Sequence, residues 1–206
     1  GGDVLARELK ARGDVVTVVD IYNLASDEQL DALRAEGISA TREVPACRFD
    51  LIAAPSHCPD SYIGDAEYDE RTTFHGLVGR LIGDTPFRIE VTGVKGKTTA
   101  CYILARLLSL AGNRVFLQTS RGREVWEEGE VRQQCEVVSI APTSLLTLPK
   151  AGHDIIIAEV SLGGSGRADI GIITNLVHDY PIAAGTRRAR ESKATVFTDR
   201  GLNLIP

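Results

Sequence analysis

A short segment rich in glycine and lysine, GVKGKTT at residues 93–99, carries the strongest chemical signal in the sequence. Glycines let a backbone approach phosphate closely, and the free N–H groups at the start of a helix bind phosphate oxygens. In such a loop Lys97 would reach the terminal phosphates, and the Thr98 hydroxyl would ligate magnesium. The general phosphate-loop pattern requires glycine where this chain has Val91, so the pattern fails at its first position. The residues predicted to hold a nucleotide are Gly93, Val94, Lys95, Gly96, Lys97, Thr98 and Thr99.

The elements around this segment match what a phosphate loop needs. The β-branched run RIEVTG at 88–93 predicts a strand before it. The apolar periodicity of TTACYILARLLSLAG at 98–112 predicts a helix after it, with Gly112 as the stop. The alternative is a glycine-containing turn with surface lysines, and the order of strand, loop and helix counts against it.

The rest of the chain alternates in the same way. In the second half we expect strands at 114–120, 154–161 and 169–175, with a charged segment holding Trp126 and a short leucine-rich helix between the first two. In the first half we expect strands at 15–20 and 49–55, with helices before the first strand, at 27–36 and at 72–83. Apolar strands separated by helices predict an α/β fold whose sheet is mainly parallel. Cys101 and Cys135 are expected to be buried in a helix and a strand.

Composition narrows the class of protein. The 206 residues hold 23 Lys plus Arg and 28 Asp plus Glu, a net charge of −5, which argues against a nucleic-acid-binding surface or electrostatic adhesion to a membrane. No apolar run reaches the roughly 18 residues of a membrane span. The four cysteines form no CxxC pair, so we expect reduced thiols in the cytoplasm. The absence of methionine and the start at Gly1-Gly2 suggest an internal piece of a longer protein.

Three further segments, taken with the loop, resemble the Mur ligase superfamily of ATP-dependent acid–amine ligases. AEVS at 158–161 is similar to that family's EVSS motif, and TNL at 174–176 followed by Asp179 is similar to its TNL..DH motif. SKA at 192–194 with Phe197 resembles the segment whose lysine is carbamoylated in many members.

The resemblance implies roles for residues beyond the loop. Glu159 would hold magnesium, a role that its place at the carboxyl end of a strand also allows. Asn175 would contact the nucleotide. Lys193 would be catalytic and, once carbamoylated, a metal ligand; an ordinary surface lysine in an arginine-rich segment is the alternative. Lys97 and Glu159 would complete the catalytic set, and Thr98 the metal ligands. The family's histidine is Tyr180 here, which puts the metal geometry in doubt, although His178 is close in sequence.

A narrower similarity carries the substrate prediction. The opening segment at 1–22, the segment at 159–175 and DYPIAAGTRRA at 179–189 resemble the Mur-like ligases of coenzyme F-430 biosynthesis in methanogenic archaea. That resemblance implies a small-molecule substrate, a tetrapyrrole carboxylate, activated with ATP and Mg²⁺ to close a carbocyclic ring. Two alternatives stay open: an amide ligase acting on a nucleotide-linked or pseudomurein precursor, and a non-catalytic phosphate-loop nucleotide-binding module.

The segment GDTP at 83–86 predicts the domain boundary, and the same resemblance implies what the two domains are. Residues 1–84 would form a Rossmann-like substrate domain lacking its first strand, and residues 85–206 an incomplete phosphate-loop ATP-binding domain. The third, C-terminal domain of Mur ligases is not covered, so we expect this piece to bind Mg-ATP weakly at best and not to turn over alone.

Several lesser candidates have two interpretations. The arginines of GTRRAR at 185–190 could bind substrate carboxylates or form a solvated basic stretch. Asp20 with residues 1–2 could position a ligand or be structural. The HCPD segment at 57–60 offers metal-ligand types, but one loop without a distant partner is weak. Trp126 could stack on a ring system, although anchoring a loop is the more frequent role.

Overall fold

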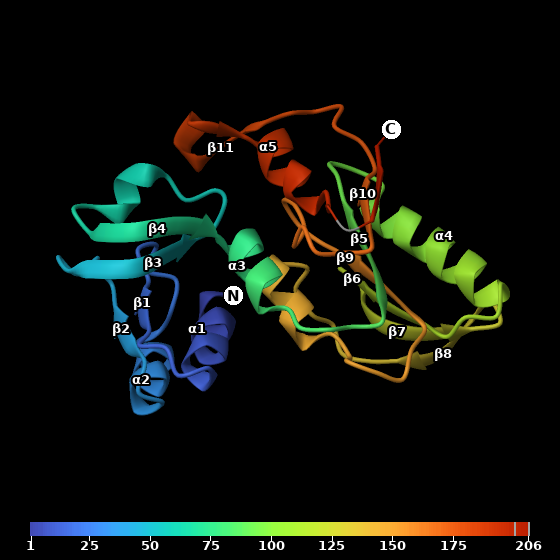
Figure 1. Ribbon diagram of the computed structural model, residues 1–206, viewed down its shortest axis with the longest axis horizontal. Helices are drawn as coiled ribbons and strands as arrows, with labels where there is room; N and C mark the ends of the chain where they lie inside the picture. The colour runs from blue at the N-terminus through green and yellow to red at the C-terminus, as the bar shows by residue number, and fades with distance from the viewer. Residues whose placement is uncertain (200, 206) are drawn as a thin grey trace.

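A computed structural model describes residues 1–199 and 201–205, and its main feature is a seven-stranded sheet (Figure 1). The strands are β5 (Phe87–Thr92), β6 (Val115–Thr119), β7 (Gly122–Glu127), β8 (Glu130–Gln134), β9 (Ile155–Glu159), β10 (Ile170–Ile173) and β13 (Leu202–Leu204). Their order is β13-β10-β5-β9-β6-β7-β8. The five strands from β13 to β6 run parallel, and β7 and β8 form an antiparallel extension. The predicted α/β fold with a mainly parallel sheet is confirmed.

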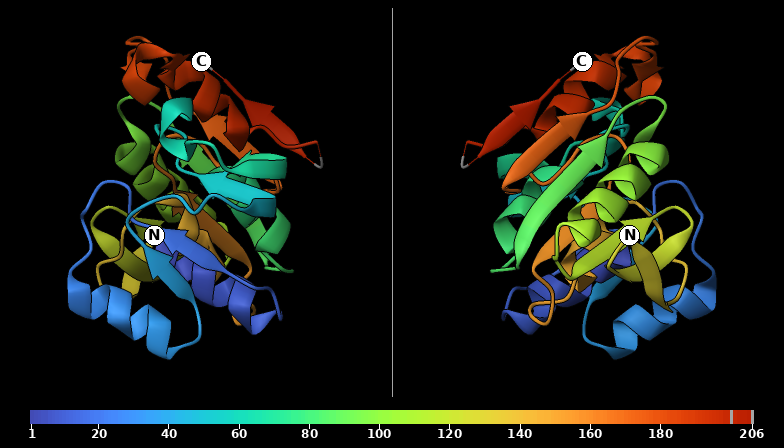
Figure 2. Two further views of the ribbon diagram at one scale, coloured as in Figure 1. Left: turned by 90° about the vertical axis from the view of Figure 1, so that its left-hand side faces the viewer. Right: turned by 90° about the vertical axis from the view of Figure 1, so that its right-hand side faces the viewer.

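Both faces of this sheet are covered. Successive strand residues point to opposite faces, and those of the central strands pack into two different cores. Val115 and Leu117 of β6 face the helix α4 (Lys97–Leu110), where they join a core with Cys101. Phe116, between them, joins a second core on the other face. The right-hand view of Figure 2 shows α4 lying against the sheet. Apolar residues on both sides explain why these strands read as continuous hydrophobic runs.

The first half of the chain holds two small parallel sheets. Its elements are α1 (Gly2–Ala11), β1 (Thr17–Val19), α2 (Asp27–Ala35), β2 (Ser39–Thr41), β3 (Arg48–Ala54), the 3₁₀ helix η1 (Asp60–Ile63), β4 (Glu67–Thr73) and α3 (Phe74–Leu81). β1 pairs with β2, and β3 pairs with β4. Ser26 and Gln29 form a reciprocal capping box at the start of α2, which fixes where that helix begins.

Short elements link the strands of the large sheet or close the chain. They are η2 (Pro142–Thr147), β11 (Pro181–Ile182), η3 (Ala183–Gly185), β12 (Arg187–Arg188), α5 (Ala189–Lys193) and η4 (Ala194–Val196). β11 and β12 form a small antiparallel ladder. None of the helices in residues 1–199 and 201–205 has the length and apolar character of a membrane span.

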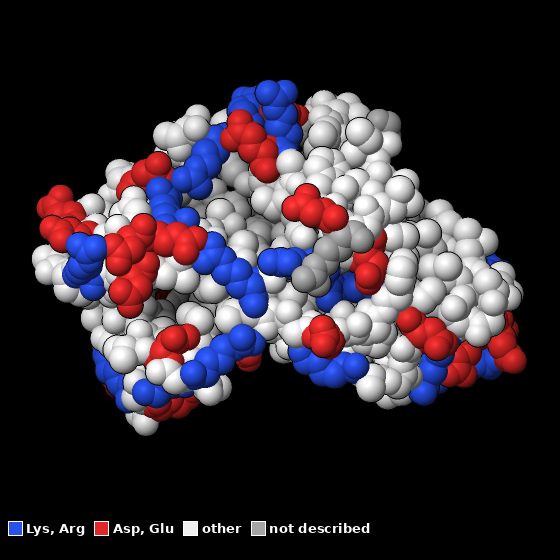
Figure 3. All heavy atoms as spheres, in the orientation of Figure 1, with Lys and Arg blue, Asp and Glu red and all other residues white. Residues whose placement is uncertain are grey.

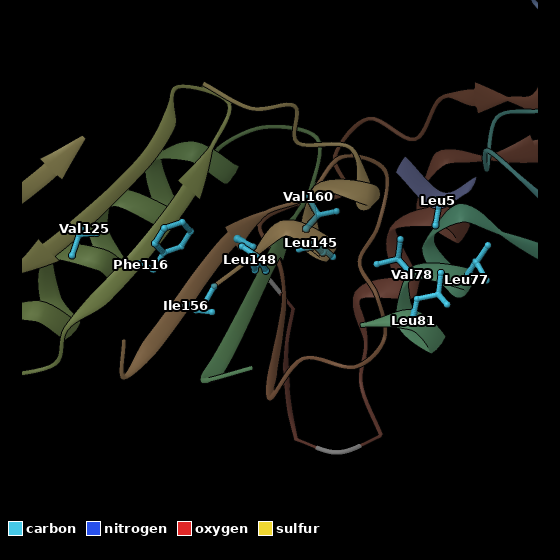
Figure 4. Packing of buried hydrophobic residues seen from close by; sticks show 11 residues of the cluster. Leu5, Leu77, Val78, Leu81, Phe116, Val125, Leu145, Leu148, Ile156 and Val160 are labelled. Atoms are coloured by element: carbon cyan, nitrogen blue, oxygen red, sulfur yellow. The ribbon is translucent and has the colours of Figure 1, made fainter. Parts of the chain in front are cut away.

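One hydrophobic core joins the two halves of the chain. Figure 4 shows side chains from α1 and α3 on one side and from the large sheet on the other, with η2 between them. The labelled members are Leu5, Leu77, Val78, Leu81, Phe116, Val125, Leu145, Leu148, Ile156 and Val160. The predicted boundary at residue 84 lies in the loop between α3 and β5. The division into two domains stays a proposal, since α3 precedes that boundary but packs in this shared core.

The structure corrects three local predictions. The helix expected at 72–83 begins only at Phe74, because Thr73 ends β4 and its hydroxyl caps the helix by accepting the Gly76 N–H. Trp126 lies in the strand β7 rather than in a loop, 9% exposed and edge-on to Tyr102. Cys135 follows the end of β8 and is only half-buried, whereas Cys101 is buried in α4 as expected.

Candidate active site

The phosphate loop connects the end of β5 to the start of α4, as the sequence predicts. Gly96 is the N-cap of α4 and has a left-handed backbone with φ of 81°, a conformation that glycine adopts without strain. No side chain caps this helix, so the N–H groups of its first turn have no side-chain partner at the N-cap. Gly93 has φ of 143°, and a Cβ there would lie 2.1 Å from the Thr174 Oγ1. Only glycine fits this position.

The segment after β10 braces the loop. The Thr174 hydroxyl donates to the Lys95 carbonyl at 2.6 Å, and the Asn175 side-chain amide donates to the same oxygen at 2.7 Å. The Val94 N–H donates to the Asn175 carbonyl at 3.2 Å. Asn175, predicted to contact nucleotide, therefore lies directly against the phosphate loop. The bonds hold the loop at the carboxyl end of the sheet, where open α/β folds bind ligands.

The carboxylate of Glu159 lies close to polar groups from three other residues of the site. Glu159 ends β9, is 2% exposed, and pairs in register with Val91 of β5. Its Oε2 accepts the Thr98 hydroxyl at 2.9 Å and the Ser120 N–H at 3.1 Å. The Lys97 Nζ lies 3.9 Å from its Oε1 and donates to the Gly93 carbonyl at 3.3 Å. A carboxylate is thus held beside a hydroxyl and an ammonium at the mouth of the loop.

These residues fit a magnesium nucleotide. Mg²⁺ is held in nucleotide sites by one or two protein ligands, several waters and the substrate phosphates, which matches one hydroxyl and one carboxylate. Within the described residues no group of three or more His, Cys, Asp or Glu side chains could hold a metal on its own. A metal here would depend on the phosphates for its remaining ligands. Thr99 lies one residue further along α4 and is exposed.

Lys193 lies in an unusual environment for a lysine. It ends α5, is 2% exposed, and its Nζ lies 5.6 Å from the centre of the Tyr180 ring. Burial lowers the pKa of Lys193, and the nearby Lys97 charge lowers it further, while Asp179 opposes the shift. The surface-lysine alternative is wrong. Its role as a catalytic residue and carbamoylated metal ligand stays a proposal.

Tyr180 stands where the Mur ligase family has a histidine, and the residues beside it make separate contacts. The Tyr180 ring faces the Lys193 ammonium, and His178 is exposed. Asp179 pairs with Arg188 at 2.9 Å and with Arg190 at 3.5 Å. The Asp179 carboxylate therefore holds two of the three arginines of the segment GTRRAR, Arg188 and Arg190.

The other lesser candidates have structural partners. The Asp20 carboxylate accepts the N–H groups of Leu24 and Ala25, so it closes a turn after β1. Cys58 is buried, with its thiol 3.6 Å from the Pro59 carbonyl. The neighbouring Asp60 pairs with two arginines.

Sequence reasoning did not single out two polar contributors to the site. Ser120 follows β6, and its N–H reaches Glu159 because β6 lies beside β9. His75 of α3 is buried, with its Nε2 2.9 Å from the Ser161 carbonyl and its Nδ1 3.1 Å from the Ser56 hydroxyl. A carbonyl only accepts, so Nε2 carries the proton. Burial lowers the pKa of His75 and outweighs the opposing effect of its hydrogen bond to Ser161. The order of strands in the sheet was the signal needed to find Ser120.

Comparison with known proteins shows which proteins this chain is similar to. Residues 91–180 match the family described as Mur ligase middle domain. The protein named Coenzyme F(430) synthetase from Methanosarcina acetivorans is 34% identical over 210 residues, which cover 94% of this chain and 44% of that protein. Both levels of the resemblance drawn from the motifs are confirmed.

The chain is also similar, to a lesser degree, to one further protein and to one solved structure. The UDP-N-acetylmuramoyl-L-alanyl-D-glutamate–2,6-diaminopimelate ligase of Pseudomonas syringae pv. tomato is 32% identical over 140 residues, covering 62% of this chain and 28% of that protein. The structure of E. coli FolC in complex with ADP, without folate substrate, is 21% identical, with a TM-score of 0.47 over 64% of this chain and 40% of that one. The chain spans less than half the length of each of these three proteins.

Proposed function

Because residues 91–180 match the Mur ligase middle domain, we propose that the protein is an ATP-dependent ligase of the Mur type, which forms ADP. The observation that carries the proposal is the convergence of Lys97 and Thr98 on the buried carboxylate of Glu159. A non-catalytic nucleotide-binding module would not need both Glu159 and Lys193 in the order in which the Mur ligase family has them. The ATP dependence also favours a cytoplasmic reaction.

The proposed first step forms an acyl phosphate. A substrate carboxylate oxygen attacks the terminal phosphorus of ATP, the bond to the bridging oxygen breaks, and ADP leaves. Charge develops on the phosphoryl oxygens, and Lys97 with the N–H groups at the start of α4 lies where it would stabilise that charge. Thr98 and Glu159 would hold Mg²⁺, which supplies charge neutralisation between the phosphates. Lys193 as a carbamate would add an anionic ligand.

The proposed second step releases phosphate. A nucleophile attacks the acyl carbon, the bond to the phosphate oxygen breaks, and the nucleophile loses a proton. The 34% sequence identity to the coenzyme F(430) synthetase of M. acetivorans favours a carbon nucleophile within a nickel seco-tetrapyrrole, which closes a carbocyclic ring. In this assignment residues 1–84 form the substrate domain, and residues 85–206 form the domain that holds ATP.

A conventional amide ligase is the second candidate. The similarity to a diaminopimelate ligase favours it, because that relative joins an amino acid to a nucleotide-linked acid, as its name states. The acyl phosphate would be the same, and an amine nitrogen would replace the carbon nucleophile.

One assay separates the two. The full-length protein is given Mg-ATP with the nickel seco-tetrapyrrole acid or, separately, with amino acids and muramyl-type acceptors, and ADP release and product mass are recorded. Ring closure predicts ADP with the loss of one water from the tetrapyrrole. ADP only with the amino acid and its acceptor would contradict the tetrapyrrole assignment. Lys97→Ala should abolish ADP release in either case, and Lys150→Ala, an exposed lysine outside the site, should not.

A further inference from the structure

A small cavity lies at the carboxyl ends of β3 and β4, and none of the residues that line it belongs to the phosphate loop. Its volume is about 210 Å³, and it is lined by Ala54, Pro55, Arg71, Thr72, Thr73 and Arg187. Ala54 is the last residue of β3 and Thr73 the last of β4. Parallel strands deliver ligand-binding residues at their carboxyl ends, so the cavity occupies the ligand-binding edge of this small sheet.

Two arginines in this cavity share one carboxylate. The Arg71 Nη1 lies 2.7 Å from the Asp60 Oδ1, and the Arg187 Nη2 lies 2.5 Å from the same oxygen. Their side chains are 20% and 29% exposed, whereas that of Asp60 is 66% exposed. The arginines are therefore lodged in the wall, and the acid approaches from the solvent side. One positive charge is left without an acidic partner in this group of three.

We propose that Arg71 and Arg187 bind a carboxylate arm of the substrate, which takes the place of Asp60 between them; this assignment rests on the proposed function. A guanidinium pairs with carboxylate through two parallel hydrogen bonds, and the two guanidinium groups offer more donors than Asp60 uses. Pockets that enclose whole small molecules have roughly 300–1,000 Å³. A cavity of about 210 Å³ fits one acid-bearing arm of a larger molecule.

Hydrogen bonds connect this cavity to the ATP site. The Arg187 Nη1 donates to the Ser56 carbonyl at 3.4 Å, and the Ser56 hydroxyl meets the Nδ1 of His75. The Nε2 of His75 donates to the Ser161 carbonyl, two residues after Glu159. A substrate arm held by the arginines would thus be fixed relative to the residues proposed to activate another of its carboxylates.

The charge distribution on this face agrees with an anionic substrate. Figure 3 shows Lys and Arg side chains between the regions of β4 and β11, beside a hollow in the surface. Thr72 and Thr73 add hydroxyl groups to the lining. The cavity lining holds two arginines and no acidic residue among the described residues, whereas the chain as a whole carries a net charge of −5.

The test uses tricarballylate, a small tricarboxylate, titrated calorimetrically into the full-length protein carrying Lys97→Ala, so that the phosphate loop does not contribute. Arg71→Met and Arg187→Met should each weaken binding at least about tenfold, as expected for a lost charge-assisted hydrogen bond. Asp60→Asn, which frees both arginines, should bind as well as the parent or better. Arg48→Met is the matched control, because Arg48 pairs with Asp69 across the same two strands outside the cavity. The proposal would be overturned if both arginine variants bound tricarballylate with the affinity of the parent, or if the parent itself showed no saturable binding.

Further measurements separate this proposal from a purely structural role of the ion pairs, from a phosphate site and from failure of the proposed reaction. If the ion pairs only tie the chain together, Asp60→Asn should lower the free energy of unfolding as Arg71→Met does, with tricarballylate affinity unchanged in all variants; that result contradicts a binding site. If pyrophosphate rather than tricarballylate loses affinity in the arginine variants, the anion is a phosphate and the carboxylate assignment fails. If tricarballylate binding depends on the arginines but no tetrapyrrole is converted, the subsite stands and the proposed reaction fails. With the tetrapyrrole as substrate, Arg187→Met should raise its KM at least about tenfold and leave the KM for ATP unchanged.

Discussion

The hydroxyl of Thr98 donates a hydrogen bond of 2.9 Å to the carboxylate of Glu159, 61 residues further along the chain. The first residue belongs to the first turn of α4, and the second ends the neighbouring strand β9. The contact forms because β5 and β9 are parallel partners whose carboxyl ends lie at one edge of the sheet. It joins the phosphate-loop helix to the buried acid of the site.

Removing either partner of this contact should reduce catalysis. Glu159→Gln keeps the size of the side chain but removes its charge, and we expect kcat to fall on the order of 10²–10³-fold. Thr98→Ala should lower kcat in the same direction, while Thr98→Ser, which keeps the hydroxyl, should retain most activity. Steady-state ADP release measures both. Glu130→Gln on the exposed strand β8 is the matched control, and an equal loss there would remove the special role of Glu159.

Gly93→Ala should disturb the loop by a steric clash as well as by backbone strain. An alanine Cβ would lie 2.1 Å from Thr174 Oγ1, so the loop or the residue after β10 must move. Nucleotide affinity, measured by calorimetry with Mg-ADP, should fall at least about tenfold. Gly152→Ala is the control, because Gly152 also has a positive φ of 85° but no atom within 4 Å of the new Cβ. It should cost only about 1–2 kcal/mol of stability and leave nucleotide affinity unchanged.

Replacing His75 should change both stability and its dependence on pH. His75→Phe leaves the Ser161 carbonyl and the Ser56 hydroxyl without this partner, which should cost about 1–3 kcal/mol in the free energy of unfolding. Burial lowers the pKa of His75 below its usual value of 6.5. The unfolded chain therefore binds a proton that the folded chain excludes, and stability is lost as the pH falls from 6.5 toward the lowered pKa.

Urea denaturation at several pH values between 5 and 8 measures this effect as a difference between the two proteins. The variant should lack the part of the acid-dependent loss that comes from His75. His178→Phe, an exposed histidine, should follow the parent protein. A variant with the same acid dependence as the parent would show that His75 is protonated freely in the folded chain.

Lys193 should change stability with pH in the same direction as His75, but in a window that ends at pH 10.5 instead of 6.5. Burial lowers its pKa from the usual 10.5, so between the lowered value and 10.5 the unfolded chain binds the additional proton. Stability from this residue therefore rises with pH across that window, and below it the full cost of the buried charge applies. Lys193→Met should be more stable than the parent at pH 7, and the difference should shrink as the pH approaches 10.5.

The chemical prediction for the same residue is a carbamate. A lowered pKa leaves more neutral amine, which is the form that reacts with carbon dioxide. Mass spectrometry at saturating bicarbonate should show one added carbon dioxide that Lys193→Met lacks, together with loss of activity in that variant. Lys150→Met, an exposed lysine, should keep the adduct and the activity. No adduct, with full activity of Lys193→Met, would exclude the metal-ligand role.

Local patterns predicted the elements that hold the site. The phosphate loop and Glu159 follow the strands β5 and β9, which are apolar runs because both faces of the sheet are buried. Gly112 follows α4, whose apolar periodicity comes from packing one side of the helix on that sheet. Gly112 has φ of 91° and its N–H bonds the Ser109 carbonyl, as a helix stop requires. Short-range sequence is sufficient where a buried strand feeds directly into a loop.

Features set by pairing between distant segments could not be predicted. β4 is the polar sequence EYDERTT, and it is a strand because it pairs with β3 rather than because of any apolar alternation. The charged segment around Trp126 folds as the β7–β8 hairpin, turned by Glu128 and Gly129 with positive φ. Arg71 and Arg187 pair with the same carboxylate, that of Asp60, only because the β12 segment lies near the small sheet. These contacts require the strand order and the path of the chain, which no local window contains.

The outer strand of that hairpin has a consequence for how molecules of this protein meet in solution. β8 is the last strand of the large sheet, and all of its residues are exposed. Among the described residues no strand pairs with its outer edge, and such an edge can template a strand from another chain. Glu130 and Arg132 place charges of both signs along it, and four of its five residues are polar. A strand from another copy would have to bury those charges against its own backbone. This border of the sheet therefore resists edge-to-edge aggregation, which helps a protein with a largely apolar sheet interior to remain dispersed.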